Sequence, residues 1–138
     1  MDFSDPKLDI VSAAEQGAWM TVIGPDGVPM DSRIRLLGAD SQAFKEAVAE
    51  TVADKAVELG NIAGNPSKEH TLKMAEFNRR ATANHLAAVS AEWENIDWKG
   101  KPMECTPENA AKLYHRLPWL SEQASAFVAN RSNYLGKE

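Results

Sequence analysis

The chain has 138 residues, 43% of them hydrophobic and 25% charged, and a formal net charge of −5. This composition is ordinary for a folded domain and excludes a disordered chain. The acidic balance argues against nucleic-acid binding, which depends on clustered Lys and Arg. No apolar run approaches about 18 residues, and acids stand where a signal peptide carries basic residues. We therefore expect neither a membrane span nor secretion by that route.

The order of the expected elements predicts one mainly helical α+β domain over residues 1–138, in which about four helices accompany an N-terminal antiparallel β-hairpin. A chain of this length can bury roughly 70% of its unfolded surface, which is enough for one core. The expected parts are a polar lead (1–16), a β-hairpin (17–38), two long helices (41–93) and a closing helix–bend–helix module (97–135).

The hairpin is predicted from two β-prone runs, 19–23 and 32–37, which flank a Pro-Asp-Gly turn. Apolar and basic residues alternate in the second run, so one face should pack on the helices while Arg33 and Arg35 stay in solvent. A lone hairpin is marginal in water. We therefore expect it to pack on the helices, pair with another strand or join a partner's sheet.

The first long helix is predicted from about residue 41 to 59, with Asp40 and Ser41 as an N-cap and stop signals within 60–66. Helical spacing places four apolar residues within one arc and four acids elsewhere: Phe44, Val48, Val52 and Leu59, and Glu46, Glu50, Asp54 and Glu58. The acidic row predicts either a solvated face or a surface for a basic partner.

The second long helix is predicted from about residue 67 to 93, with Met74, Phe77 and Trp93 on its apolar side. Alanines dominate its centre, so its backbone can lie close to the first helix or to another subunit. Small-residue helix faces and an exposed hairpin edge are natural pairing surfaces, and we therefore expect the protein to self-associate as a homo-oligomer.

The closing module has the clearest helix boundaries in the chain. Thr106 stands in the N-cap position and a proline follows at the first helical position, which predicts a helix from about 107 to 116. Pro118 disfavours the helical conformation for Leu117. The chain should therefore bend here before a second helix from about 118 to 134.

A series of short motifs runs through the same module. They are Trp98-Lys99-Gly100-Lys101-Pro102, Thr106 to Ala110, Leu113-Tyr114, Pro118-Trp119, and Ala126-Phe127 through Arg131, Asn133, Tyr134 and Leu135. Together they resemble the C-terminal end of a group of tail assembly chaperones of long-tailed bacteriophages. The resemblance covers residues 96–135 well and the first part of the chain loosely.

This resemblance implies a non-enzymatic function. Chaperones of the group are thought to bind the tape-measure protein, keep its long hydrophobic helices soluble and help the tail-tube protein to polymerise. An assembly factor of this kind acts in the host cell cytoplasm and is absent from the mature virion. The alternative is a structural or regulatory adaptor that stays in its complex, and a small enzyme is a third hypothesis.

The resemblance also concerns the C-terminus. Members of the group are often made in a second, longer form by a backward ribosomal slip near the end of the short reading frame. The heptamer G-GGA-AAG permits such a slip, and its codons spell Gly-Lys. The chain ends Leu135-Gly136-Lys137-Glu138, which allows a programmed frameshift at that dipeptide. The alternative is an ordinary polar dipeptide at a disordered end.

The titratable residues form no recognisable chemical site. The histidines, His70, His85 and His115, lack the spacing of metal-ligand pairs. Cys105 is the only cysteine, which excludes an internal disulfide and fits a reducing cytosol. Cys105 and His115 could form a nucleophile pair, yet the pattern implies no orienting residue or oxyanion donor. We therefore predict no catalytic, cofactor-binding or metal-binding residue.

Aromatic residues of the closing module give the candidate protein-interaction site: Trp98, Trp119, Phe127 and Tyr134. Aromatic side chains carry large buried areas both in cores and in protein interfaces. The cluster predicts either a local core that holds the closing helices down or a docking groove for a partner, and both can hold.

Overall fold

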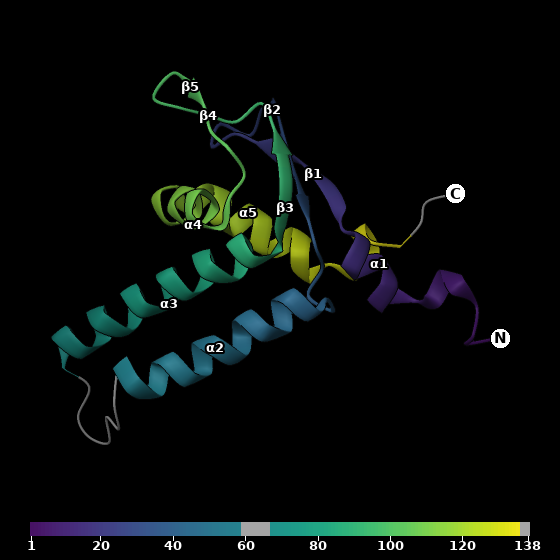
Figure 1. The fold of residues 1–138 in the computed structure, drawn as a ribbon. Coiled ribbons are helices and arrows are strands. Elements are labelled where there is room, and N and C mark those ends of the chain that lie inside the picture. Colours follow the sequence, from purple (N-terminus) through teal and green to yellow (C-terminus); the bar gives the residue numbers. More distant parts are fainter. Residues whose placement is uncertain (59–66, 136–138) are drawn as a thin grey trace.

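The computed structural model describes residues 1–58 and 67–135 (Figure 1). Within these ranges the chain is an α+β fold with five α-helices, a three-stranded antiparallel sheet and a two-stranded hairpin. The α-helices are α1 (Ile10–Gln16), α2 (Gln42–Glu58), α3 (Lys68–Val89), α4 (Pro107–Arg116) and α5 (Pro118–Ala129). The strands are β1 (Ala18–Ile23), β2 (Pro29–Leu36), β3 (Ser90–Glu94), β4 (Asp97–Trp98) and β5 (Lys101–Pro102), and the 3-10 turns are η1 (Pro6–Leu8) and η2 (Arg131–Asn133). The mainly helical α+β prediction is confirmed.

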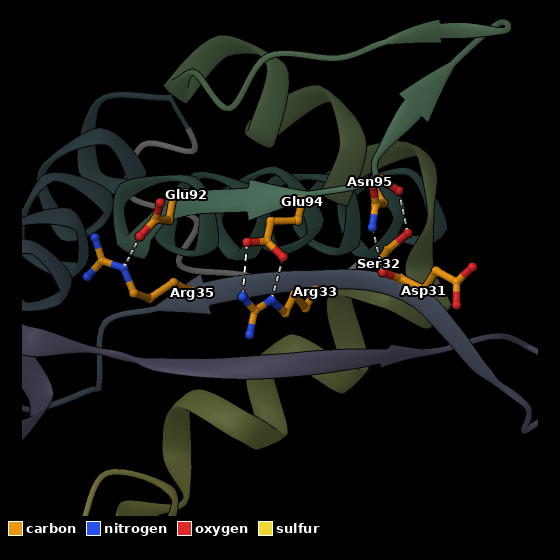
Figure 2. Close-up of polar contacts among 7 residues, drawn as sticks. All are labelled: Asp31, Ser32, Arg33, Arg35, Glu92, Glu94 and Asn95. Atoms are coloured by element: carbon orange, nitrogen blue, oxygen red, sulfur yellow. Dashed lines mark hydrogen bonds and ion pairs between the residues drawn. The ribbon is translucent and has the colours of Figure 1, made fainter.

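The sheet has β2 at its centre, with β1 on one side and β3 on the other. Its inner face forms the core with α3, α4 and α5, and Ile34 and Leu36 on this face are 0% exposed. On the opposite face Arg33 and Arg35 project away from the helices, which lie behind the strands in Figure 2. The predicted alternation along the second strand is therefore confirmed.

The second long helix is shorter than predicted. It ends at Val89, and the residues up to 94 form β3, so the prediction of a helix to residue 93 is wrong. The hydroxyl of Ser90 donates to the carbonyl oxygen of Leu86 at 2.8 Å and closes the last helical turn. The strand then satisfies its backbone groups on β2, a pairing partner that helical periodicity does not reveal.

Cross-strand ion pairs accompany this pairing (Figure 2). Arg33 donates to the two carboxylate oxygens of Glu94 at 2.6 and 2.9 Å, and Arg35 donates to Glu92 at 2.7 Å. Exposed ion pairs contribute only about 0–1 kcal/mol each. Their main effect is to select the register, because a shift by one residue would place the carboxylates on the apolar face.

The helices α2 and α3 form an antiparallel arm that extends away from the sheet (Figure 1). They are joined where Thr51 and His85 share a hydrogen bond of 2.6 Å and the ring of Phe44 meets that of His85 edge-on at 5.8 Å. The predicted apolar arc of the first helix is wrong at Val48 and Val52, which are 37% and 67% exposed. A helix that packs mainly on one neighbour buries only a narrow stripe.

Most of the other side chains of residues 42–57 face solvent. The acids Glu46, Glu50 and Asp54 are exposed, which agrees with a solvated face. The predicted helix end at Leu59 and the stop signals within 60–66 lie outside the described residues. No helix within the described ranges is long and apolar enough to cross a membrane.

The polar lead contains a helix that the sequence pattern did not predict. In α1 the side chain of Asp9 accepts a hydrogen bond from the N–H of Ser12 at 3.1 Å, and Ala14 is 1% exposed. A Cβ added at Gly38 would lie 2.8 Å from the Cβ of Ala14, so only glycine permits this approach. One buried residue in a seven-residue helix is too weak a periodic signal to detect.

The closing module bends as predicted. The first helix spans the predicted residues, and Leu117, with φ −121° and ψ 84°, separates it from α5. The second helix ends at Ala129 instead of 134. The side chain of Asn130 accepts from the N–H of Ser132 at 3.1 Å, and this local hydrogen bond starts the turn η2 in place of a further helical turn.

The N-cap of α4 provides a direct test of local stabilisation. The hydroxyl of Thr106 accepts from the N–H of Asn109 at 3.1 Å. We expect Thr106→Ala to lower the free energy of unfolding by about 1 kcal/mol, because this N–H loses its partner. Thr106→Ser, which keeps the hydroxyl, should stay close to the wild type in urea unfolding. Equal losses in both variants would contradict a role for the cap.

An ion pair joins the start of the arm to the C-terminal turn. Arg131 donates to the two carboxylate oxygens of Asp40 at 2.7 and 2.9 Å. The hydrogen bond from the guanidinium lowers the pKa of Asp40 below its ordinary value. A lowered folded-state pKa means that this pair stabilises the fold above the unfolded-state pKa of about 4 and that the contribution is lost as the pH falls through the folded-state pKa.

We expect Asp40→Asn to lower Tm at neutral pH and to show a smaller decrease in Tm between about pH 5 and pH 3 than the wild type. A smaller decrease remains because Glu94 and Glu76 also have lowered pKa values. Thermal scans across this pH range give the comparison. Arg131→Gln removes the other partner of the same ion pair and is measured in the same way. An acid-induced decrease in Tm that is the same in Asp40→Asn and wild type contradicts this assignment.

Candidate functional site

Two of the predicted interaction residues, Trp98 and Trp119, line one groove of about 340 Å³. The groove lies where the β4–β5 hairpin, the bend between α4 and α5 and the end of the β1–β2 hairpin meet. Its apolar lining comprises Val22, Met30, Ile96, Leu113, Leu117 and Leu120 besides the two tryptophans, and Ser32, Asn95 and Asp97 supply its polar groups.

A tight turn positions Trp98. Lys99 and Gly100 have φ values of 52° and 79°, and they connect β4 to β5 as a two-residue loop of the type that requires positive φ at both positions. The hairpin is fastened to the sheet because the indole N–H of Trp93 donates to the carbonyl oxygen of Met103 at 2.7 Å. The sequence motif Trp-Lys-Gly-Lys-Pro therefore builds one wall of the groove.

The turn after β3 directs the chain toward this hairpin (Figure 2). Asn95 has a φ of 57°, its side-chain amide donates to the carbonyl oxygen of Asp31 at 3.1 Å, and its own carbonyl oxygen accepts from the hydroxyl of Ser32 at 2.5 Å. Asparagine tolerates this left-handed conformation better than most residues. These bonds hold the end of β3 against β2 beside the groove.

The bend between α4 and α5 positions Trp119, the second tryptophan that lines the groove. Pro118 starts α5, so Trp119 falls in its first turn while Leu117 turns the chain. Both tryptophans of the groove are half-buried, and Met30 at its rim is 47% exposed. Beneath them Leu113 is 3% exposed and belongs to the core. The result is a fixed floor with partly exposed aromatic walls, which can receive apolar side chains of a partner.

The other two predicted residues lie elsewhere. Phe127 and Tyr134 meet edge-on with ring centroids 5.8 Å apart, Tyr134 is 7% exposed, and its hydroxyl donates to the carbonyl oxygen of Leu37 at 3.2 Å. Burial raises the pKa of Tyr134. This pair holds the C-terminal turn against the end of β2, as the hypothesis of a local aromatic core describes.

A polar cluster that the sequence did not reveal joins α3 to α4. His115 Nε2 lies 2.9 Å from the carboxylate of Glu76, and Arg79 donates to the carbonyl oxygen of His115 at 2.9 Å. The hydrogen bond with His115 lowers the pKa of Glu76. Arg79 and His115 of this cluster line an open hollow of about 680 Å³. His115 is 39 positions from Glu76 in the chain, so no spacing rule could have found this contact.

Cys105 and His115 have different hydrogen-bond partners in the structure. His115 bonds to Glu76, whereas the thiol of Cys105 donates to the carbonyl oxygen of Ser90 at 3.6 Å. Burial raises the pKa of Cys105, which favours the unreactive thiol over the thiolate. Burial lowers the pKa of His85 and favours its neutral form. Among residues 1–58 and 67–135, no group of three or more His, Cys, Asp or Glu side chains is arranged to hold a metal ion.

No protein-family model, curated protein or solved structure matches this chain significantly. The functional assignment therefore rests on the groove and on the motifs of the closing module.

The different environments of the aromatic residues lead to a stability prediction. We expect Tyr134→Phe to lower the free energy of unfolding by about 1 kcal/mol, because the carbonyl oxygen of Leu37 loses its donor. Urea unfolding followed by circular dichroism measures this change. A variant as stable as the wild type would show that the hydroxyl does not fasten the C-terminal turn.

Proposed function

We propose that this protein is a non-enzymatic tail assembly chaperone of a long-tailed bacteriophage. In this proposal it binds apolar helical segments of the tape-measure protein and helps the tail-tube protein to polymerise. It acts in the host cell cytoplasm and is absent from the mature virion. The observation that carries the proposal is the apolar groove between Trp98 and Trp119.

The groove has the chemistry that such a client requires. A long helical protein exposes apolar side chains until its own partners cover them, and these side chains fit an aromatic-walled groove in the helix-in-groove mode of recognition. Tryptophans dominate binding energy at many interfaces because they combine a large area with few rotatable bonds. The groove-lining tryptophans belong to two of the motifs that resemble the phage chaperones, Trp98 to Pro102 and Pro118-Trp119.

The proposal extends to a longer form of the protein made by a backward ribosomal slip. The dipeptide Gly136-Lys137 lies outside the described residues, and its part in the proposal concerns the messenger RNA.

The test uses one groove variant and one matched control. Met30 and Leu72 are exposed apolar residues, 47% and 61% exposed, but only Met30 borders the groove. We expect Met30→Glu to weaken binding of a recombinant tape-measure fragment by at least about tenfold, because a carboxylate placed among apolar walls must be desolvated. Leu72→Glu should bind like the wild type. Isothermal titration calorimetry gives the affinities, and thermal scans confirm that both variants fold.

Three outcomes would overturn the proposal. The wild type binds no tape-measure fragment, both variants bind like the wild type, or both lose affinity equally. Mass spectrometry of purified virions then separates a chaperone from an adaptor, because an adaptor that stays in its complex is detected in the finished particle.

A further inference from the structure

The strand β1 is an edge of the three-stranded sheet. Two hydrogen bonds just beyond β2 show how the backbone groups alternate there. The N–H of Leu37 donates to the last residue of α3, on the β3 side, and the N–H of Gly38 donates to Ala14, on the opposite side. Because these directions alternate along a strand, Ile34 and Leu36 direct their N–H and C=O groups toward β1.

The register then identifies which residues of β1 face outward. Ala18 and Met20 are the partners of the two inward-directed residues of β2, so their backbone groups are used within the sheet. Trp19 and Thr21 alternate with them, and their N–H and C=O groups therefore point away from the sheet.

A side chain covers one end of this edge. The N–H of Ile23 donates to Oε1 of Gln123 at 2.7 Å, and Nε2 of Gln123 donates back to the carbonyl oxygen of Ile23 at 2.8 Å. The amide thus occupies the place of a neighbouring strand at Ile23, which agrees with the outward direction of the odd-numbered residues. Within the described residues, the outward backbone groups of Trp19 and Thr21 have no such partner.

Between Ala18 and Ile23 the edge carries neither of two residue types that commonly prevent strand pairing. The sequence Ala-Trp-Met-Thr-Val-Ile contains no charged residue and no proline. The opposite edge strand, β3, carries Glu92 and Glu94, and the thiol of Cys105 donates to its first carbonyl oxygen. On the outer face of β1 the guanidinium of Arg33 lies 4.1 Å from the ring centre of Trp19 and holds this side chain in place.

We propose that β1 pairs antiparallel with β1 of a second copy of this chain, about a twofold axis through Met20. In this register Trp19 lies opposite Thr21 of the partner subunit, and Thr21 lies opposite Trp19 of the partner subunit. Each such pair exchanges two hydrogen bonds, so the open N–H and C=O groups of both residues are satisfied in both copies. Two three-stranded sheets become one continuous sheet.

We assign the pairing strand to a second copy of this chain because the open N–H and C=O groups of Trp19 and Thr21 lie symmetrically about Met20. An identical antiparallel strand therefore presents the groups that they need. The same register places Ile23 opposite Gly17 of the partner subunit. At that position the amide of Gln123 already satisfies the N–H and C=O groups of Ile23, and Gly17 lies outside β1, so the paired segment ends before this position. The inference is independent of the proposed function, since dimerisation through β1 requires no client and no residue of the tryptophan-lined groove except Val22 belongs to this strand.

Proline substitution gives the sharpest test. The N–H of Thr21 points outward, so Thr21→Pro removes no hydrogen bond from the β1–β2 ladder, and edge strands accept proline at such positions. We expect the wild type to form dimers with rising concentration and Thr21→Pro to dimerise at least about tenfold more weakly. Thr21→Val is the matched control, because it keeps the N–H and nearly the same shape, and it should dimerise like the wild type. Analytical ultracentrifugation measures all three.

Hydrogen exchange provides a readout that needs no variant. The amides of Trp19 and Thr21 should become protected as the wild-type concentration rises, while that of Met20 is protected at every concentration. A wild type that stays monomeric at high micromolar concentration overturns the proposal, as does a dimer in which those two amides exchange freely. A folded Thr21→Pro variant that dimerises like the wild type overturns it as well. If that variant fails to fold, the hydrogen exchange of the wild type decides the question.

Discussion

The antiparallel pairing of β2 with β3 is the constraint on which the rest of the structure depends. It joins residues that are about sixty positions apart in the chain, as between Arg33 and Glu94. The pairing ends α3 at Val89 and completes a sheet wide enough to cover the helices. A hairpin of two strands is marginally stable alone, and the third strand together with the packed helices removes that weakness.

The point where α3 ends and β3 begins also determines where the closing module lies. The hydroxyl of Ser90, at the point where helix becomes strand, lies 2.7 Å from the hydroxyl of Tyr114 on α4. Tyr114 is 1% exposed, and burial raises its pKa, so this neutral hydroxyl pair lies inside the core. A hydroxyl buried here without a hydrogen-bond partner would destabilise the fold. This cost favours the one position of α4 relative to β3 in which the two hydroxyls meet. The arm of α2 and α3 begins near this buried junction, and most of its described side chains at the far end are exposed.

The surfaces offered for binding follow from that arrangement. The groove lined by Trp98 and Trp119 exists because the turn at Asn95 and the bend at Leu117 bring two tryptophans that are distant in the chain to one site. The open part of β1 exists because the sheet adds its third strand on the other side of β2. Both surfaces are suited to protein partners: the first offers apolar area, and the second offers unsatisfied backbone groups.

Features that depend on neighbouring residues could be predicted from the amino-acid sequence. The cap at Thr106, the bend before Pro118 and the alternation around Ile34 each follow from a few adjacent residues, and the structure agrees with all three. The conformation of residues 90–94 depends on tertiary structure. Their sequence is compatible with a helix, and they form a strand because β2 provides a pairing partner. Tertiary structure also decided which apolar residues are buried, because Val52 has the spacing of a core residue but is 67% exposed, with no covering element among residues 1–58 and 67–135. Burial and strand pairing are properties of two segments together, and a local pattern describes only one of them.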